Sequence, residues 1–173
     1  VALNKLQKEF IKLLNSLEKH KVGHGDIQCG NVFIDKDGDD IKVSLVDYDN
    51  MYVPDLESMG SEEKGLPQFQ HPRRNKSDYN HHIDRFSIWV CLTAIEAIKN
   101  DKNLWNEKNT SGGFNTGENM LFEERDFINP DNSPLFKNLL SGKSGKAASK
   151  YAKRLKQYCL LDSLKDIPKP KLV

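Results

Sequence analysis

Hydrophobic residues recur at helical spacing over the first twenty-one positions of the chain. Leucine and phenylalanine follow one another at intervals of three and four residues from Leu3 to Leu17, and lysine and glutamate occupy the positions between them. This pattern predicts an amphipathic helix over residues 1–21, ended near Gly23. Because no capping residue precedes the helix in this sequence, we expect the chain to belong to a larger structure.

Two short runs of β-forming residues come next, Val32–Ile34 and Ile41–Val46, and an acidic segment with an Asp-Gly pair joins them. An Asp-Gly pair between two such runs predicts a β-hairpin. A calcium loop of the EF-hand type needs glycine at its sixth position and glutamate at its twelfth. Counting from Asp35, glycine is fourth and Val46 is twelfth. We therefore interpret the acidic segment as a solvated hairpin tip.

The middle of the chain combines a long irregular segment with a strongly apolar one. Residues 50–80 contain three prolines and two glycines, which predicts an ordered loop of a length that usually serves a function. Residues 83–99 are apolar on most sides of a helix, and such a helix is normally central and buried. Residues 101–120 are rich in asparagine and glycine and predict a second loop.

The C-terminal third predicts two further helices. The first is short and covers residues 134–140, and the second is amphipathic and runs from about 145 to 160. Residues 167–173 are rich in proline and lysine, and we expect them to form a frayed tail or a linker.

Composition excludes several classes of protein. The chain has 173 residues, a length typical of one domain, and 26 Lys and Arg balance 25 Asp and Glu. A formal charge of +1 removes the main support for binding to nucleic acid or to a membrane surface. No apolar run approaches the roughly 18 residues of a membrane span, so we expect none.

The three cysteines, Cys29, Cys91 and Cys159, are more than sixty residues apart and form no C-x-x-C pair. This spacing favours neither a disulfide framework nor a zinc site. We therefore expect a reducing, cytoplasmic setting.

One cluster of polar residues carries candidate chemistry. Asp26 and Asn31 lie on a tight loop between the first helix and the hairpin, and Asp47 ends the returning strand, so the hairpin brings Asp47 beside that loop. Two carboxylates and an amide oxygen are ligands that Mg²⁺ prefers. If Asn31 and Asp47 hold the metal, Asp26 remains free to accept a proton from a hydroxyl, which is the division of roles that phosphoryl transfer requires.

These residues, with two later motifs, resemble the catalytic segment of the protein-kinase-like superfamily. The H-x-D motif falls on His24–Asp26, the asparagine on Asn31, and the metal-binding motif on Asp47–Asp49. Gly65–Arg73 resembles the segment that closes a kinase activation loop, and Asp84–Ser87 resembles the start of the central helix. The four motifs occur in the family's order. The run Val46–Pro54, together with Gln70–Arg74, resembles a divergent bacterial branch of Ser/Thr-kinase-like proteins.

The resemblance implies an α+β fold, predominantly α-helical, corresponding to the C-terminal lobe of a kinase with a small catalytic hairpin and no N-terminal lobe. The implied divisions are a lobe over 1–166, a catalytic loop at 24–31, a metal-binding segment at 47–49, an activation-type loop at 50–73, a central helix at about 83–99 and a tail at 167–173.

The resemblance also implies roles for individual residues. Asp26 is the catalytic base, His24 supports the loop, and Gln28 stands where kinases carry a lysine that contacts the γ-phosphate. Asn31 and Asp47 are the expected ligands of Mg²⁺ and, through the metal, of ATP.

Three residues are expected to give structural support: Asp84, Pro72 and Arg73. Asp84 is expected to hold the backbone of the catalytic loop. Arg73 replaces a glutamate of the family pattern, and we hypothesise a charge-reversed pair with Glu123 or Glu124.

Several positions depart from the family pattern. Gly25 replaces an arginine that often binds a phosphorylated activation loop, Gln28 replaces the lysine, and Asp49 replaces a flexible glycine. No glycine-rich phosphate loop and no strand lysine with a helix glutamate partner occur in the sequence. We therefore expect a missing N-terminal lobe, supplied in cis or in trans, and no activity from this chain alone.

The expected function is ATP- and Mg²⁺-dependent phosphoryl transfer to a Ser or Thr hydroxyl of a protein substrate. Two alternatives remain open. Gln28, Asp49 and the missing lobe favour a pseudokinase or interaction module without catalysis, whereas the presence of Asp26, Asn31 and Asp47 together favours an enzyme. A small-molecule phosphotransferase uses the same polar residues, but Gly65–Pro72 and Asp84–Ser87 favour the protein-kinase branch.

Overall fold

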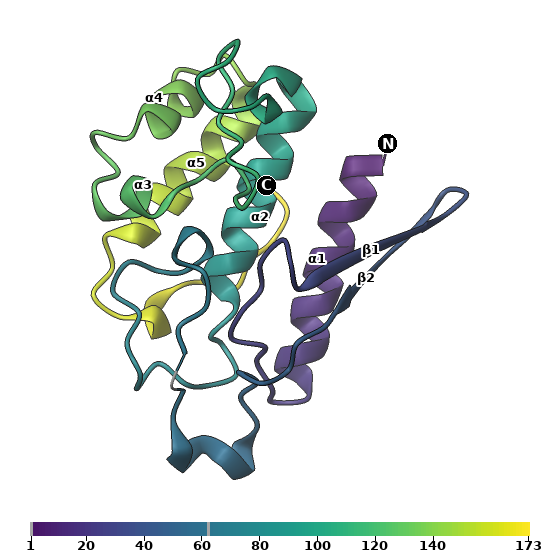
Figure 1. The fold of residues 1–173 in the computed structure, drawn as a ribbon, viewed down its shortest axis with the longest axis vertical. Helices are drawn as coiled ribbons and strands as arrows, with labels where there is room; N and C mark the ends of the chain where they lie inside the picture. Colours follow the sequence, from purple (N-terminus) through teal and green to yellow (C-terminus); the bar gives the residue numbers. More distant parts are fainter. Residues whose placement is uncertain (1, 62) are drawn as a thin grey trace.

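The computed structural model describes residues 2–61 and 63–173, which form a mostly helical α+β structure with one antiparallel pair of strands (Figure 1). This confirms the predicted class. The α-helices are α1 (Ala2–Lys19), α2 (Arg85–Asn100), α3 (Glu124–Ile128), α4 (Pro134–Leu140) and α5 (Lys146–Cys159). The strands are β1 (Val32–Asp37) and β2 (Asp40–Leu45). Four short 3₁₀ helices are η1 (Pro54–Met59), η2 (Pro67–Phe69), η3 (Lys102–Trp105) and η4 (Leu164–Asp166).

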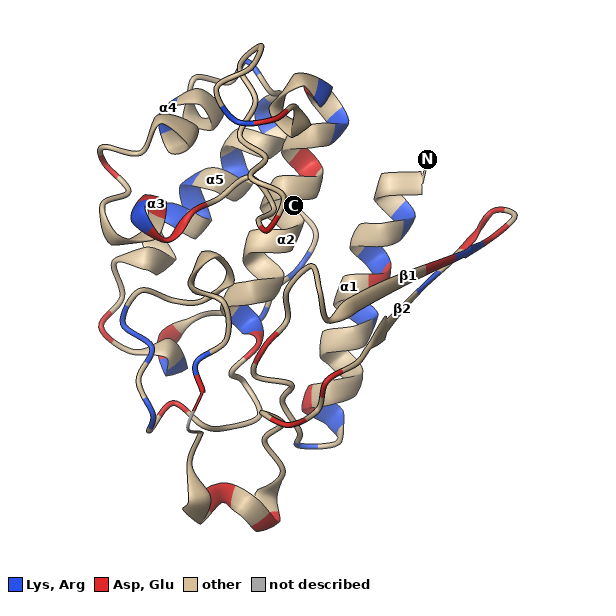
Figure 2. Ribbon diagram, viewed as in Figure 1, with Lys and Arg blue, Asp and Glu red and all other residues tan. Residues whose placement is uncertain are grey.

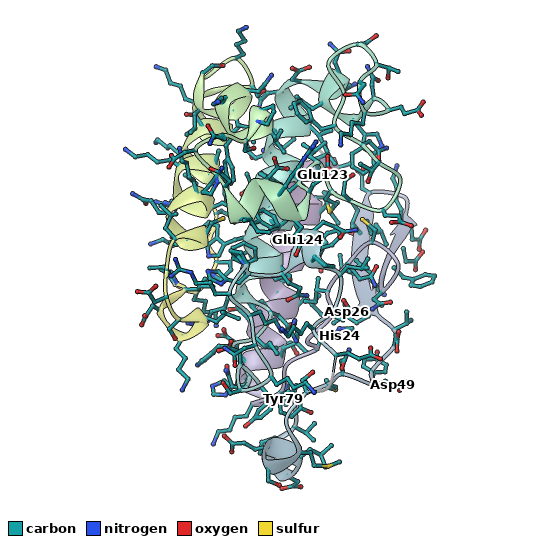
Figure 3. The ribbon with its side chains drawn as sticks, turned by 60° about the vertical axis from the view of Figure 1, so that its left-hand side comes forward. His24, Asp26, Asp49, Tyr79, Glu123 and Glu124 are labelled. Atoms are coloured by element: carbon teal, nitrogen blue, oxygen red, sulfur yellow. The ribbon has the colours of Figure 1, made fainter. Side chains whose placement is uncertain are left out.

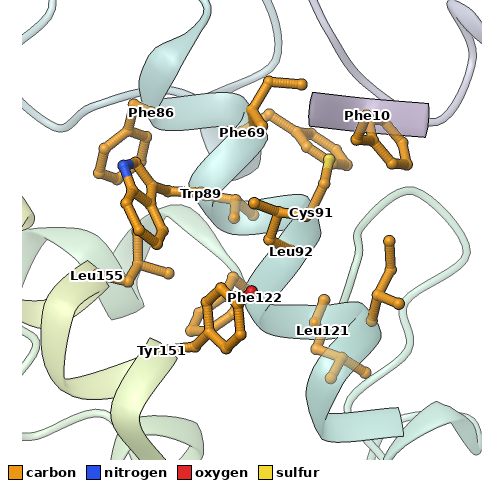
Figure 4. Close-up of a cluster of buried hydrophobic side chains, with 14 of the residues drawn as sticks. Phe10, Phe69, Phe86, Trp89, Cys91, Leu92, Leu121, Phe122, Tyr151 and Leu155 are labelled. Carbon is orange, nitrogen blue, oxygen red and sulfur yellow. The ribbon is translucent and has the colours of Figure 1, made fainter. Parts of the chain in front are cut away.

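Helix α2 is the centre of the hydrophobic core, as its all-round apolar pattern predicts. Every residue from Phe86 to Ala97 is buried. Aromatic and aliphatic side chains from α1, α5 and the loops surround it, among them Phe10, Tyr151 and Phe122 (Figure 4). A helix enclosed in this way cannot shift without disturbing several packed neighbours, because protein interiors are close-packed. The first residues of α2 are therefore held in a fixed position.

The hairpin pairs β1 with β2 in a register that places Val32 opposite Leu45 and Asp37 opposite Asp40. Gly38 has a φ of 54° in the turn, so the predicted Asp-Gly hairpin is confirmed. The hairpin packs along α1 and projects its acidic tip away from the helices (Figure 1).

The predicted short helix at 134–140 is confirmed as α4, and the C-terminal helix is observed at Lys146–Cys159. Helix α3 was not predicted, because five residues are too few for a periodic pattern. Among the described residues, no helix has the length and apolar character needed to cross a bilayer.

The prediction of a frayed tail is wrong. Ile167 is fully buried in the core, and the indole Nε1 of Trp89 donates a hydrogen bond of 2.9 Å to the carbonyl oxygen of Pro168. The backbone N–H of Val173 donates to the hydroxyl oxygen of Tyr151 at 3.0 Å. Composition could not reveal these contacts, because each partner lies far away in the sequence.

Glu18 connects the tail to α1 and α2. Its carboxylate, only 8% exposed, accepts from Arg85 Nε at 2.8 Å, from Lys169 Nζ at 2.8 Å and from His82 Nδ1 at 3.2 Å. Burial acts to raise the pKa of Glu18, but the hydrogen bonds from Arg85 and Lys169 outweigh it and lower that pKa from 4.5 to about 2. The ionised carboxylate therefore stabilises the junction of three segments.

We predict that Glu18→Gln lowers the free energy of unfolding by about 2 kcal/mol at pH 7, because it leaves Arg85 and Lys169 without the carboxylate that they share. The folded pKa lies below the ordinary value, so this stabilisation is complete above about pH 5 and is lost as the pH falls toward 2. Urea unfolding at several pH values measures the difference. The matched control is Glu9→Gln, which removes a surface pair with Lys12 and should cost less than about 0.5 kcal/mol. Equal losses for both variants would contradict the account.

Candidate active site

The loop between α1 and β1 is fixed to the start of α2 by one carboxylate. Asp84 precedes α2 and is 1% exposed. Its Oδ2 accepts from the backbone N–H of His24 at 2.6 Å, and its Oδ1 accepts from that of Gly25 at 2.8 Å. Burial raises the pKa of Asp84, against the opposing effect of these two donors and of nearby Arg74. Both carboxylate oxygens thus position the loop backbone.

The Asp26 carboxylate is held by three N–H donors from two segments. Its Oδ2 accepts from Gln28 Nε2 at 3.2 Å and from Asn31 Nδ2 at 2.9 Å, and its Oδ1 accepts from the backbone of Leu66 at 3.2 Å. Asp26 is half-buried and lies next to His24 (Figure 3). Three donors fix the orientation of a carboxylate while leaving it lone pairs for a further proton.

Gln28 is folded back onto Asp26. While its Nε2 donates to Asp26, its Oε1 accepts from the backbone N–H of Gly30 at 3.2 Å. The side chain therefore bridges the two ends of the loop and orients Asp26 rather than reaching outward.

Asn31 uses its amide nitrogen entirely within the loop. Nδ2 donates to the backbone oxygen of Asp26 at 3.0 Å as well as to the Asp26 carboxylate. None of the described residues donates a hydrogen bond to the amide oxygen Oδ1 of Asn31, so that oxygen is free to bind another group.

Asp47 lies at the base of the hairpin, two residues beyond the end of β2. The backbone N–H of Val46 donates to the carbonyl oxygen of Asn31 at 3.0 Å, which continues the pairing of the two strands by one residue, to the position before Asp47. Asp47 is exposed and has a φ of 64°, a conformation that aspartate tolerates better than most residues. Asn31 and Asp47 therefore both lie at the base of the hairpin.

Two protein ligands are compatible with Mg²⁺, which usually keeps several waters and binds substrate phosphates. The described residues contain no group of three or more His, Cys, Asp and Glu side chains that could hold a metal. Asn31 and Asp47 offer two oxygen ligands, fewer than a closed structural site uses.

His24 links the two halves of the candidate site. A carbonyl oxygen can only accept, so the contact of 3.0 Å to Val46 means that His24 Nε2 carries a hydrogen and donates it. His24 Nδ1 then accepts from the backbone N–H of Asp26 at 3.3 Å. The ring also packs against Tyr48, with centroids 5.8 Å apart. His24 thus sets the position of the Asp26 backbone relative to Val46, which follows β2 and precedes Asp47.

The activation-type segment closes over Asp26 at Gly65. Gly65 has a φ of 72°, and a Cβ at this position would clash with the Asp26 carboxylate and the side-chain amide of Gln70. The hydroxyl of Ser87 in α2 donates to the carbonyl oxygen of Phe69 at 2.8 Å and so attaches this segment to α2.

Pro72 is half-buried at the end of this segment, between two anchored residues. His71 is buried, its Nε2 contacts the Tyr158 carbonyl oxygen at 2.9 Å, and burial lowers the pKa of its ring. Arg73 pairs with Asp162, just beyond α5.

The hypothesis that Arg73 pairs with Glu123 or Glu124 is therefore wrong, because its acidic partner is Asp162. Glu123 instead pairs with Lys108 at 2.5 Å and with Arg125 at 3.2 Å. An acidic partner for Arg73 does exist, but the sequence alone could not distinguish Asp162 from the other carboxylates.

Arg74 is the residue of this site that sequence reasoning missed. It is buried, and its Nη1 donates to the carbonyl oxygen of Gly25 at 2.6 Å and to the side-chain oxygen of Gln70. Gly25 has a φ of 81°, and a side chain there would collide with the Asn50 carbonyl oxygen. No pattern near Arg74 marks it, since its neighbour Arg73 is a surface residue of the same type.

The charged residues are unevenly distributed along the chain, although the formal net charge is only +1. Residues 35–63 contain ten Asp and Glu against two Lys, and the acidic positions gather at the hairpin tip, along the segment after β2 and on η1 (Figure 2). Lysines and arginines gather along α5 (Figure 2). The candidate metal position therefore lies on the negative side of the molecule, where a divalent cation is attracted.

Comparison with known proteins adds no assignment. No family model matches the chain, and no curated protein matches it.

We predict that Asp84→Asn lowers the free energy of unfolding by about 1–3 kcal/mol, because an amide has one acceptor oxygen where two buried N–H groups need partners. Hydrogen exchange of the His24 and Gly25 amides should accelerate, while exchange in the centre of α2 changes only with global stability. Asp166→Asn, at an exposed position of η4, is the matched control. Unchanged exchange at His24 and Gly25 in the Asp84 variant would show that the carboxylate does not hold the loop.

Proposed function

We propose that the chain carries the catalytic half of an ATP- and Mg²⁺-dependent phosphotransferase that acts on a Ser or Thr hydroxyl of a protein. One observation carries the proposal. Asn31 binds Asp26 through its amide nitrogen, and its backbone carbonyl oxygen accepts from the N–H of Val46, the residue before Asp47, so one residue connects a candidate base to the segment that carries a candidate metal ligand.

Asp26 is suited to accept the proton of the attacking hydroxyl. Its carboxylate is oriented by Gln28, Asn31 and Leu66, which removes the need to reorganise it during the reaction. Asn31 Oδ1 and Asp47 would hold Mg²⁺. When bound, Mg²⁺ and ATP supply charge neutralisation and the phosphoryl group.

A second lobe, in the same polypeptide or in another chain, completes the proposed enzyme. Phe33 and Ile34 on β1 are 58% and 53% exposed, an apolar surface next to the candidate site that another domain could cover. The proposal includes a cytoplasmic location and a protein substrate.

A catalytically inactive interaction module is the second candidate. The observation in its favour is Gln28, which is engaged with Asp26 and brings no positive charge to a bound phosphate. A small-molecule phosphotransferase would use the same Asp26, Asn31 and Asp47.

The test measures transfer from labelled ATP to a Ser/Thr-containing protein, with this chain and with a chain extended upstream by about 80–100 residues, the size of a small domain. We expect transfer from the extended chain only. Asp26→Asn should lower the rate by at least about 100-fold, because proton transfer contributes that much or more. Asp47→Asn should abolish the transfer that Mg²⁺ stimulates, because it removes a proposed ligand of the metal.

The control is Asp39→Asn at the hairpin tip, which also removes one negative charge but lies outside the site. An Asp26→Asn protein as active as the parent would refute the assignment of the base. No transfer from either chain, with the fold intact, would favour the interaction module.

A further inference from the structure

A cavity of about 530 Å³, which we call the η1 cavity, lies between the segment after β2, η1 and Tyr79. Ten of its eleven lining residues belong to residues 48–63, and Tyr79 is the eleventh. In the view of Figure 3, Asp49 and Tyr79 lie between His24 and η1. The volume is within the roughly 300–1,000 Å³ of ligand sites in proteins, so the η1 cavity is large enough for a long side chain of another molecule.

 

The buried side of the η1 cavity is fixed by a small aromatic cluster. Tyr79 is 8% exposed, and its hydroxyl donates a hydrogen bond of 2.7 Å to the carbonyl oxygen of Met51. Its ring packs edge-on against Tyr52, with centroids 5.1 Å apart, and Ile83 completes the cluster. A ligand would therefore meet a wall that is already ordered, which lowers the cost of binding.

The lining carries negative charge only. Asp49 and Glu63 are exposed, and no Lys, Arg or His among the described residues lines the η1 cavity. Residues 47–63 contain six Asp and Glu and no Lys, Arg or His. Within residues 2–61 and 63–173, neither of the two lining carboxylates forms an ion pair. The charge of the lining therefore attracts a cation.

Glu63 is positioned by its neighbours. Its Oε2 accepts from Asn50 Nδ2 at 3.2 Å, and the hydroxyl of Ser61, which is 7% exposed, donates to its carbonyl oxygen. Among the described residues, no other group donates to the carboxylate of Glu63, and none donates to that of Asp49. Three carboxylate oxygens of the lining are thus available to hydrogen-bond donors of a ligand.

Much of the remaining lining is apolar. Leu56 and Met59 are 41% and 73% exposed, and Met51 and Val53 are half-buried. Lysine and arginine pack their methylene groups on apolar surface while the charged end reaches polar groups, and methionine adapts to the shape of what it contacts. Carboxylates beside an apolar wall therefore fit a long basic side chain better than a metal ion, which needs oxygen ligands on several sides.

The η1 cavity is joined to the candidate active site near both ends of its lining segment. Gly23 and Tyr52 exchange backbone hydrogen bonds of 3.1 and 2.7 Å at one end. At the other end, Gly65 approaches the Asp26 carboxylate so closely that a Cβ would clash with it. Glu63 precedes Gly65 by two residues, which span at most about 7 Å. A basic side chain in the cavity would therefore belong to a residue close in sequence to the one whose hydroxyl meets Asp26.

We propose that the η1 cavity binds the side chain of an arginine or lysine in the acceptor protein, close in sequence to the hydroxyl that receives the phosphoryl group. The identity of the ligand as the acceptor rests on the proposed function. Binding of the basic side chain itself does not, because it needs neither nucleotide nor metal.

The experiment titrates the folded chain, at constant ionic strength, with an end-blocked alanine-based peptide that has a central serine and one arginine on each side of it. Backbone NMR signals of the chain are followed. We expect saturable shifts of the Asp49, Ser61 and Glu63 amides. The matched peptide has citrulline in place of arginine, which keeps the shape but removes the charge, and it should bind at least about fivefold more weakly. Equal binding of the two peptides would overturn the proposal.

Two double variants separate the η1 cavity from the acidic surface around it. Asp49→Asn with Glu63→Gln should weaken binding of the arginine peptide by at least about fivefold, since each exposed pair contributes about two- to fivefold. Asp55→Asn with Glu57→Gln removes two charges from η1 that do not line the cavity, and it should change binding by less than about twofold at physiological salt. Equal losses in the two double variants would show binding by the general acidic field and contradict the proposal.

A titration with MgCl₂ alone tests the competing occupant. We expect the arginine peptide to bind equally well with and without Mg²⁺ once ionic strength is matched. Displacement of the peptide by Mg²⁺, with shifts at Asp49 and Glu63, would identify a metal site and overturn the proposal.

The peptide titration also separates this proposal from the proposed function. Asp26→Asn should abolish phosphoryl transfer yet keep the binding of the arginine peptide, since Asp49, Glu63 and Tyr79 remain in place. Phosphoryl transfer by the extended chain without any preference for the arginine peptide would remove the cavity proposal alone and leave the assignment of Asp26 standing.

Discussion

The candidate site depends on one buried carboxylate. Asp84 accepts hydrogen bonds from two successive backbone N–H groups, those of His24 and Gly25, and so joins the loop to the beginning of α2. Helix α2 is enclosed by the core, so its first turn is among the least movable points of the fold. The position of Asp26, two residues after His24, follows from that anchor.

The same anchor organises the segments that arrive later in the sequence. Gly25, held by Asp84, offers its carbonyl oxygen to Arg74, and Asp26 accepts from the backbone of Leu66. The activation-type segment is thus attached to the loop by buried or half-buried hydrogen bonds rather than by surface ion pairs. Such bonds are costly to break without replacement, which favours one arrangement of the site.

The sequence predicted those parts of the fold that local patterns determine. The apolar residues of α2, the Asp-Gly turn of the hairpin and the short helix α4 all carry a signal within a few residues of one another. The packed tail, the partner of Arg73 and the burial of Arg74 depend on residues more than forty positions away, so no local pattern reveals them. Gly25 illustrates the difference. The sequence shows only that glycine replaces an arginine of the family pattern, whereas the structure shows that Arg74 and Asn50 lie where a side chain at this position would be.

Paramagnetic broadening by Mn²⁺, added with a non-hydrolysable ATP analogue, tests the central claim most directly. If Asn31 and Asp47 hold the metal, amide signals at the base of the hairpin should broaden first. Asp47→Asn should remove this broadening, and Asp39→Asn at the tip should preserve it. Broadening centred on the hairpin tip or on η1, and unaffected by Asp47→Asn, would contradict the assignment.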